Sequence, residues 1–309
     1  MAGSSTSAEY GSMDGYLASL STLDKPEIKI EHKLKAIQDL CSHLESIVAH
    51  PCYSSFLARS VASILGFLKA GEPCFISEEP MQQLRKLLLE FLNRIPSKDD
   101  LLPYVQKILN QLFEQFTVEN EENGLIILKI VVEFHKAFKL SFNTPVLEYV
   151  QLLKKIYADF PNHVDKVFQT QKGLKVRDFS TNSLEEILRV TYSSTRIECE
   201  GQANEAEKVK QYTLIPRSLR SLRVLTEIPI VVVVLYKVCE EKLYKEIEEF
   251  IPIIMELINL ESNKEAMKEP SFNKDIHFDF IAVQVKALMF LSYLIRTYEE
   301  SVSNNSSNF

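Results

Sequence analysis

Four residues within one short stretch are of the types that commonly bind metal ions: Cys41, His43, His50 and Cys52. Thiolate and imidazole groups are the ligands of structural zinc sites, which normally present them in tight pairs along the chain. Cys41 and His43 fall in a predicted helix, where residues two apart point to different sides. We therefore expect surface histidines and buried cysteines, and we predict no metal site.

Motifs of nucleotide and acyl-transfer chemistry are missing from the sequence. It contains no phosphate-binding G-x-x-x-x-G-K-[ST] or G-x-G-x-x-G loop, neither of the kinase strings H-R-D and D-F-G, and no G-x-S-x-G elbow. Adjacent carboxylates occur at predicted helix starts and on polar helix faces, at Glu78 and Glu79, Glu121 and Glu122, and Glu248 and Glu249. Acid–base catalysis needs a pocket that perturbs a pKa, and nothing in the pattern predicts one. We expect solvated charges, no catalytic residue and no cofactor.

Two other patterns have a chemical interpretation. The segment Leu84–Leu88 spells L-x-x-L-L, a form in which an amphipathic helix docks into a receptor groove. Leucines at this spacing are also typical of a helix that faces its own core, and we favour the core. Arg217, Arg220 and Arg223 recur every third residue of a predicted helix. They could contact an acidic partner, but we expect them to pair with acids of the same chain.

The composition of the 309 residues is that of a folded protein, with 46% hydrophobic and 25% charged residues. Glycine (8) and proline (12) are scarce for sandwich or nucleotide-binding folds, which need many tight turns. A net charge of −7 argues against nucleic-acid binding through phosphate neutralisation. The five cysteines are odd in number and dispersed, which indicates a reducing compartment.

No segment of the sequence reads as a membrane anchor or a secretory signal. The longest apolar run, Ile228–Tyr236, is shorter than the roughly 20 residues that span a bilayer. The N-terminus lacks the basic and apolar regions of a secretory signal. We expect no membrane association.

Apolar residues between 26 and 168 recur every three or four positions, which is the period of an amphipathic helix. This first block predicts helices over 28–48, 53–69, 78–95, 99–116, 119–138, 144–160 and 162–168. Prolines and glycines separate them, and Ser77 and Thr144 are expected to cap the third and the sixth. Residues 1–25 are predicted to be a flexible N-terminus that can hold a short helix.

Residues 169–212 interrupt the pattern with glycines, clustered Ser and Thr, and a polar run over 198–211. We predict a polar inserted loop with a short helix at 184–190. A second block, 213–300, predicts helices over 217–227, 230–241, 245–260 and 276–298, followed by a disordered tail, 301–309. The run Ile230–Val234 has strong β propensity, but a lone strand among helices has no partner, so we predict a fully buried helix.

The spacing of the predicted helices indicates the fold. Helix pairs return about every 40 residues, and no single pair can bury its apolar face, so neighbouring pairs must stack. We predict an all-α, HEAT-like helical-repeat solenoid of stacked antiparallel helix pairs.

Several strings resemble the N-terminal helical repeats of the TRRAP family of transcription-coactivator scaffolds. They keep the family's order through most of residues 27–300, at Gln83–Pro96, Asn120–Ile126, Ser221–Pro229, Phe250–Met255 and Asp279–Tyr298. The family also carries a variable linker where this chain has residues 169–212. The resemblance implies a short or truncated form of a HEAT-repeat pseudokinase of the phosphatidylinositol-3-kinase-related family, without the kinase-like region.

The function that this resemblance implies is a non-catalytic, nuclear scaffold. Its partners would be proteins, namely subunits of histone acetyltransferase complexes and transcriptional activators, without direct nucleic-acid contact and without a small-molecule substrate. The matching strings read as structural, so no contact residue follows from them. Two alternatives remain: an adaptor or transport HEAT protein of the importin kind, and a truncated paralogue with little independent function. An enzyme would need a catalytic set that the sequence lacks.

Overall fold

The computed structural model describes residues 12–139, 144–163, 174–176, 181–199, 210–239, 243–261, 264, 266–268 and 272–306. Expectations for residues 1–11, 164–168 and 307–309 lie outside this part of the chain. The chain separates into two compact units, Met1–Phe138 and Lys139–Phe309. Each unit has its own stack of helices.

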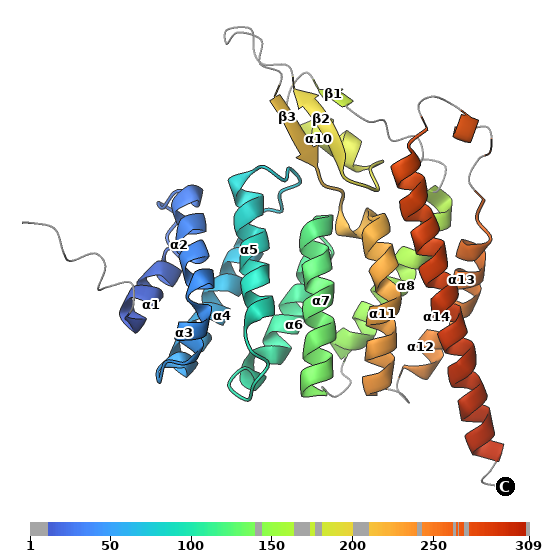
Figure 1. Cartoon of the computed structure of the whole chain (residues 1–309), viewed down its shortest axis with the longest axis horizontal. Helices are drawn as coiled ribbons and strands as arrows, with labels where there is room; N and C mark the ends of the chain where they lie inside the picture. Colours follow the sequence, from blue (N-terminus) through green and yellow to red (C-terminus); the bar gives the residue numbers. More distant parts are fainter. Residues whose placement is uncertain are drawn as a thin grey trace, which may run out of the picture. The chain divides into compact units, whose positions relative to one another are not determined.

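Helices of the first unit lie in two layers (Figure 1). One row places α5 between α2 and α7, and behind it α6 packs on both α4 and α7. The short helices α1 and α3 pack beside α2. The bounds are α1 (Met13–Ser21), α2 (Ile30–Ser42), α3 (Leu44–Val48), α4 (Tyr53–Ala70), α5 (Pro80–Arg94), α6 (Leu102–Phe116) and α7 (Glu121–Phe138).

Side chains at helical spacing fill the space between these layers. Leu84 and Leu88 of α5, Phe116 of α6 and Ile130 of α7 have no exposed surface. Burial of each such side chain stabilises the fold by about 1.5–3 kcal/mol. The apolar periodicity therefore predicted the correct faces of these helices.

Two predicted helix starts and one predicted helix differ from the structure. Helix α5 begins at Pro80 with Glu79 as its N-cap, instead of starting behind a Ser77 cap. Proline is tolerated there because the first amide has no intrahelical partner. Helix α6 begins at Leu102, after the predicted start at residue 99. The predicted helix 28–48 is two helices, α2 and α3, which meet at His43.

The N-terminal region holds the short helix that the sequence allowed. Helix α1 starts after Ser12, whose Oγ accepts the N–H of Gly15 at 3.2 Å. This is the bond by which an N-cap satisfies a free amide.

The second unit is also built mainly from stacked helices. Helix α11 packs on α14, and α13 packs on α14 and α8. The bounds are α8 (Thr144–Asp159), α10 (Thr181–Leu188), α11 (Leu222–Cys239), α12 (Tyr244–Glu248), α13 (Phe250–Ile258) and α14 (Lys274–Ser306), with 3₁₀ turns at Phe160–His163, Ser218–Arg220 and Ala266–Lys268. Helix α8, which the sequence analysis placed in the first block, belongs to this unit. The predicted all-α helical-repeat fold is confirmed, with one addition.

That addition is a three-stranded sheet in the region predicted to be a loop. Strands β1 (Leu174–Val176), β2 (Thr195–Cys199) and β3 (Lys210–Leu214) lie in the order β1-β2-β3, with β1 parallel and β3 antiparallel to β2. Ile197 pairs with Leu174 on one side and Tyr212 on the other. The loop prediction was wrong for these residues, while α10 matches the predicted short helix.

The valine-rich segment forms a helix, as predicted, but it is not fully buried. Val231, Val232 and Val234 are buried in α11, whereas Ile230 is 48% exposed. The separate helices 217–227 and 230–241 are instead one helix that runs through Pro229.

Pro229 lies inside α11 without ending it. Proline has no N–H, so it cannot bond to the carbonyl of Leu225 four residues earlier. Tyr157 of α8 donates its phenolic hydroxyl to that carbonyl at 3.0 Å. A side chain of the adjacent helix thus replaces the hydrogen bond that the proline removes.

The C-terminal helices also differ from their predicted bounds. The predicted helix 245–260 is two helices, α12 and α13, and Pro252 lies in the first turn of α13, where its missing amide breaks no bond. Helix α14 continues to Ser306, so residues 301–306 are helical instead of a disordered tail.

Candidate protein-interaction surface

The four candidate metal ligands do not form a site. Cys41 is buried, and this burial raises the pKa of its thiol to about 11, away from the thiolate that a metal requires. Cys52 is exposed, and its backbone N–H donates to Nδ1 of His50 at 3.1 Å. Within the described residues, no group of three or more His, Cys, Asp or Glu side chains could hold a metal ion.

The L-x-x-L-L string belongs to the core of the first unit. Leu84 and Leu88 have no exposed surface, so they are not available to a receptor groove. The core interpretation is confirmed.

The carboxylate pairs are solvated in two of three cases. Glu78, Glu79, Glu248 and Glu249 are exposed. Glu122 pairs with Lys86 of α5 at 3.0 Å, and Glu249 pairs with Lys154 of α8. Glu121 has no exposed surface, so the solvated reading was wrong there.

The three arginines do not share one helix. Arg217 precedes a 3₁₀ turn and donates from Nη2 to both carboxylate oxygens of Glu185, at 2.7 and 2.8 Å. Arg220 donates to the backbone carbonyl of Arg189. Arg223 lies in α11 near Asp279, where burial raises the pKa of that carboxyl and the Ser193 hydroxyl and the Arg223 charge partly oppose this. Pairing within the chain is confirmed for Arg217.

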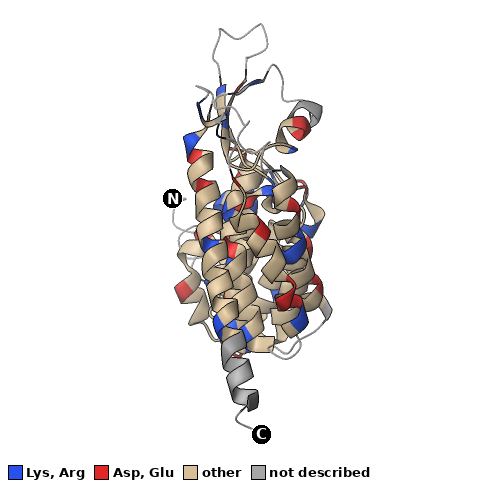
Figure 2. Ribbon diagram, turned by 90° about the vertical axis from the view of Figure 1, so that its right-hand side faces the viewer, with Lys and Arg blue, Asp and Glu red and all other residues tan. Residues whose placement is uncertain are grey.

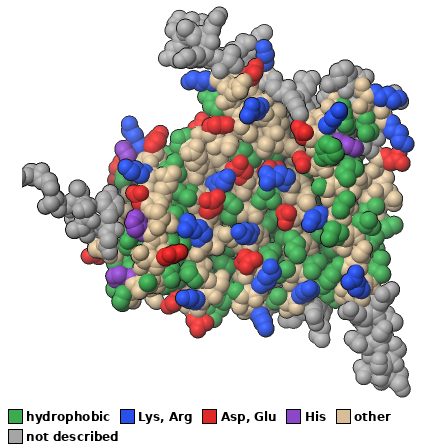
Figure 3. Space-filling view, in the orientation of Figure 1, with side chains coloured by type: hydrophobic (Ala, Val, Ile, Leu, Met, Phe, Trp, Pro, Cys, Tyr) green, Lys and Arg blue, Asp and Glu red, His purple; other side chains and the backbone are tan. Residues whose placement is uncertain are grey.

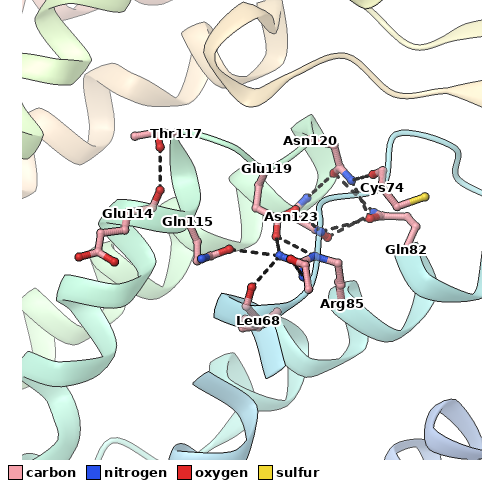
Figure 4. Close-up of polar contacts among 11 residues, drawn as sticks. Leu68, Cys74, Gln82, Arg85, Glu114, Gln115, Thr117, Glu119, Asn120 and Asn123 are labelled. Carbon is pink, nitrogen blue, oxygen red and sulfur yellow. Dashed lines mark hydrogen bonds and ion pairs between the residues drawn. The ribbon is translucent and has the colours of Figure 1, made fainter. Parts of the chain in front are cut away.

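A buried polar network that the sequence analysis missed joins α4, α5, α6 and α7 (Figure 4). We call it the Arg85 cluster, and it consists of Gln82, Arg85, Gln115, Glu119, Asn120 and Asn123. Arg85 Nε donates to Glu119 Oε1 at 2.9 Å, and its Nη atoms donate to the carbonyls of Gly71 and Leu68 at 2.9 and 3.1 Å. The guanidinium therefore satisfies free carbonyls at the end of α4 as well as the acid.

The acidic half of the cluster is equally well bonded. Asn123 Nδ2 donates to Glu119 Oε2 at 2.8 Å, and Asn120 Nδ2 donates to Gln82 Oε1 at 2.6 Å. Asn120 also caps α7, because its Oδ1 accepts the N–H of Asn123 at 3.0 Å. The cluster fixes how α5 sits against the connection between α6 and α7.

One signal in the sequence could have revealed this cluster. Arg85 lies three and four residues before Leu88 and Leu89, and three after Gln82, on the apolar side of the helix. A charge in phase with the core must be paired, because an isolated buried charge is too costly. The acidic string at 119–122, which we read only as a helix start, supplies the partner.

The second unit exposes an apolar face on α14. Large hydrophobic side chains on this helix are between 40% and 69% exposed: Phe278, Ile281, Val285, Leu288, Met289 and Ile295. In Figure 3 hydrophobic side chains gather over α14, and Figure 2 shows few charged residues along its middle. Contiguous apolar surface of this kind marks interaction sites.

The same helix is the one described segment that is long and apolar enough to cross a membrane. Within Lys274–Thr297 an 18-residue window has a mean hydropathy of 1.6, and 28% of that window is buried. Length and composition alone do not separate a membrane helix from a core or interface helix. One side of α14 packs on α11 and α13.

Comparison with known proteins gives matches along almost the whole chain. No family model matches it. The chain is 37% identical over 93% of its length to Transcription-associated protein 1 of Drosophila melanogaster, and 34% identical over 94% to the human Transformation/transcription domain-associated protein. It is 24% identical over 91% to the Saccharomyces cerevisiae protein named SAGA complex/NuA4 acetyltransferase complex subunit TRA1.

These relatives are much longer than the chain, which spans 8%, 7% and 8% of their lengths. The match therefore concerns one stretch of each relative, and almost the whole of this chain aligns with that stretch. By this likeness the chain belongs to the family of the transformation/transcription domain-associated proteins.

Proposed function

We propose that this chain is a non-catalytic interaction scaffold that works in transcription, in the nucleus. The observation that carries the proposal is the likeness over 91–94% of the chain to transcription-associated proteins, one of which is named as a subunit of acetyltransferase complexes. Its proposed partners are subunits of histone acetyltransferase complexes and transcriptional activators. The chain contributes binding surface, and any catalysis belongs to its partners.

The physical properties of the chain support a scaffold. Stacked helices form an extended surface on which partner helices or short segments can dock. The Arg85 cluster holds the first unit in one arrangement, so a partner would meet a preformed surface. The net charge of −7 favours protein partners over nucleic acid.

The test is affinity purification of the tagged 309-residue chain from nuclear extract, followed by mass spectrometry. We expect acetyltransferase-complex subunits and activators to be recovered. The matched control is Leu88→Asp, which buries a charge in the core, because partners that recognise the folded surface should be lost from it. The purified chain should show no acetyl transfer to histones.

Each other outcome contradicts the proposal in a different way. Recovery of transport receptors and their cargo would indicate an adaptor. Recovery of chaperones alone would mean that the chain has little independent function. Acetyl transfer by the purified chain would show that it is an enzyme.

A further inference from the structure

Helix α1 of the first unit packs on both α2 and α4 (Figure 1). We call the surface of α2 and α4 that it covers the α1 seat. One side of α1 makes the contact, with the buried residues Met13, Tyr16 and Leu20 at steps of three and four. This spacing is typical of an amphipathic helix that docks on other helices. A helix of nine residues is too short to be stable in water by itself, so α1 depends on its seat.

Polar contacts fasten the turn that follows α1. Asp24 Oδ2 accepts hydrogen bonds from Arg59 Nη2 at 2.8 Å and from Ser63 Oγ at 3.0 Å, and both donors lie on α4. Lys33 of α2 donates from Nζ to the Leu23 carbonyl at 3.3 Å. The side chains of Asp24 and Arg59 are 41% and 56% exposed, so water and salt weaken their attraction. The ion pair that fastens α1 is therefore specific but weak.

The position of Lys33 makes the docking of α1 costly. Lys33 is 4% exposed, and its Nζ lies 5.4 Å from the centroid of the Phe67 ring. Among the described residues, this ring and the Leu23 carbonyl are the contacts of the ammonium. An ammonium has three donors, so these contacts replace its lost water only in part. Release of α1 and its turn would return the ammonium to water and offset some of the lost apolar contact.

The connection between α1 and α2 allows such a release. Residues 22–29 form turns and contain no helix. Movement of α1 on this connection therefore breaks no hydrogen bond inside α2, which begins at Ile30. The α1 seat consists of helices that belong to the core of the first unit, so it stays in place when α1 leaves.

We propose that the α1 seat is a docking site for a helix of a partner protein, and that α1 fills it as a displaceable internal ligand. The partner helix carries apolar side chains at the spacing of Met13, Tyr16 and Leu20. A carboxylate follows them at the place of Asp24, where it pairs with Arg59. This site rests on the proposed scaffold function and deepens it, because it assigns one surface and one class of partner to that function.

The first test measures binding of a fluorescent synthetic peptide of residues 12–24 to the full chain by anisotropy. In the wild type α1 competes at the high effective concentration of a tethered segment, so binding should be weak. Leu20→Asp places a charge in a contact that is 0% exposed, so this chain should release α1 and bind the peptide at least tenfold more tightly. The matched control is Ala18→Asp, on the exposed side of α1, which should bind as the wild type does.

The second test weakens the fastening of α1 without changing the apolar contact, so it does not depend on the folding of the Leu20→Asp chain. Asp24→Ala removes the acceptor of Arg59 and Ser63. The peptide affinity of this chain should rise by about two- to fivefold, as expected for an exposed ion pair. In the wild-type chain, the amide hydrogens of residues 13–23 should exchange faster than those of α4 and α5. Asp24→Ala should speed their exchange by the same factor, because both measurements report the released fraction.

Four outcomes would overturn the proposal. The peptide could bind the Leu20→Asp and Asp24→Ala chains no better than the wild type, or a peptide that itself carries Leu20→Asp could bind equally well. The amides of α1 could exchange only with those of α4, in global unfolding. A wild-type dimer in sedimentation equilibrium that Leu20→Asp abolishes would instead assign the seat to α1 of a second copy.

Failure of this site and failure of the scaffold function are distinguishable. Peptide binding without recovery of partners from nuclear extract would keep the site and remove the function. Recovery of partners by a chain that does not bind the peptide would keep the function and remove the site.

Discussion

Arg85 is a charged side chain with no exposed surface. The fold can bury this charge because hydrogen-bond acceptors surround it. The carboxylate of Glu119 and the carbonyls of Gly71 and Leu68 replace the water that the guanidinium loses. Glycine at position 71 leaves room for the guanidinium, because a Cβ there would lie 3.0 Å from Arg85 Nη1. Each polar side chain of the cluster forms a hydrogen bond with another member of the cluster, so the arrangement depends on all of them.

Replacement of Arg85 should therefore be far more costly than a surface arginine. We expect Arg85→Met to lower the free energy of unfolding by about 3–5 kcal/mol, because Glu119 remains as an unpaired buried charge. Urea unfolding followed by circular dichroism measures this change. The double variant Arg85→Met/Glu119→Met should recover much of the loss. A single variant as stable as the wild type would show that the pair is not buried in solution.

His135 is a second buried group whose ionisation affects the fold. Burial lowers the pKa of His135, and its Nδ1 contacts the Val131 carbonyl at 2.7 Å, while Nε2 has no partner among the described residues. An unfolded histidine binds its proton below about pH 6.5. The folded chain resists that proton, so stability is complete above this pH and falls as the pH drops toward the lowered folded value.

We expect the free energy of unfolding to decrease by at most about 1.4 kcal/mol per pH unit below pH 6.5 through this group. Urea unfolding at pH 7.5, 6.5 and 5.5 measures the slope. His135→Leu removes the titrating group, so its slope over this range should be shallower by that amount. Equal slopes in the two proteins would show that His135 is accessible to protons.

At the scale of elements, α11 shows how a neighbouring helix changes what a local signal means. Proline in a helix interior costs about 3 kcal/mol or more, which is why the sequence pattern placed a helix end at Pro229. The hydroxyl of Tyr157 offsets part of this cost at the Leu225 carbonyl. Tyr157 lies 68 residues away in sequence, so no local rule could reveal it.

Tyr157→Phe should lower the free energy of unfolding by about 1–3 kcal/mol, because it leaves a buried carbonyl without a partner. In the background of Pro229→Ala the new amide can bond to Leu225, so the same substitution should cost less. A double-mutant cycle in urea measures the difference. Equal costs in the two backgrounds would mean that the tyrosine and the proline act independently.

The apolar faces of α5 and α7 were predictable from spacing alone. Leu88→Ala and Phe134→Ala should each lower the free energy of unfolding by about 2–5 kcal/mol, because their side chains are 0% and 2% exposed. Leu102→Ala, at a residue 50% exposed, should change it by less than about 0.5 kcal/mol. Thermal or urea unfolding separates these values. Similar losses at Leu88 and Leu102 would contradict the assigned faces.

The short strands were the elements that we did not predict from the sequence. In β2 the buried residues Thr195, Ile197 and Cys199 alternate with Arg196 and Glu198, which is the period of a strand. The alternation lasts five residues, and its partner β3 follows a long polar run. The argument that a lone strand lacks a partner was sound for Ile230–Val234 but did not apply to a pair of weak strands.

At the scale of the whole molecule, we expect each of the two compact units to fold independently of the other. The first unit contains its own apolar core and the complete Arg85 cluster. The segment Met1–Phe138, expressed alone, should therefore give a helical spectrum and one cooperative urea transition. Arg85→Met should shift this transition. A segment without a cooperative transition would show that the first unit needs the second to fold.

The exposed apolar side of α14 could be predicted only in part. Helical periodicity located α14, but the structure was needed to show which of its apolar side chains α11 and α13 cover and which stay exposed. A sequence gives the phase of a helix and not the number of its neighbours. For the same reason Arg85 looked like an ordinary polar position until Glu119, 34 residues away, was placed beside it.

The bond from Tyr157 to the Leu225 carbonyl has a consequence for the order in which this sequence could change over generations. With any other residue at 229 the backbone amide can bond to the Leu225 carbonyl, whereas with a proline there the carbonyl depends on the Tyr157 hydroxyl. The tyrosine is therefore expected to be the older of the two. While Pro229 is present, loss of the tyrosine is expected to be harmful, so the two residues should be retained together.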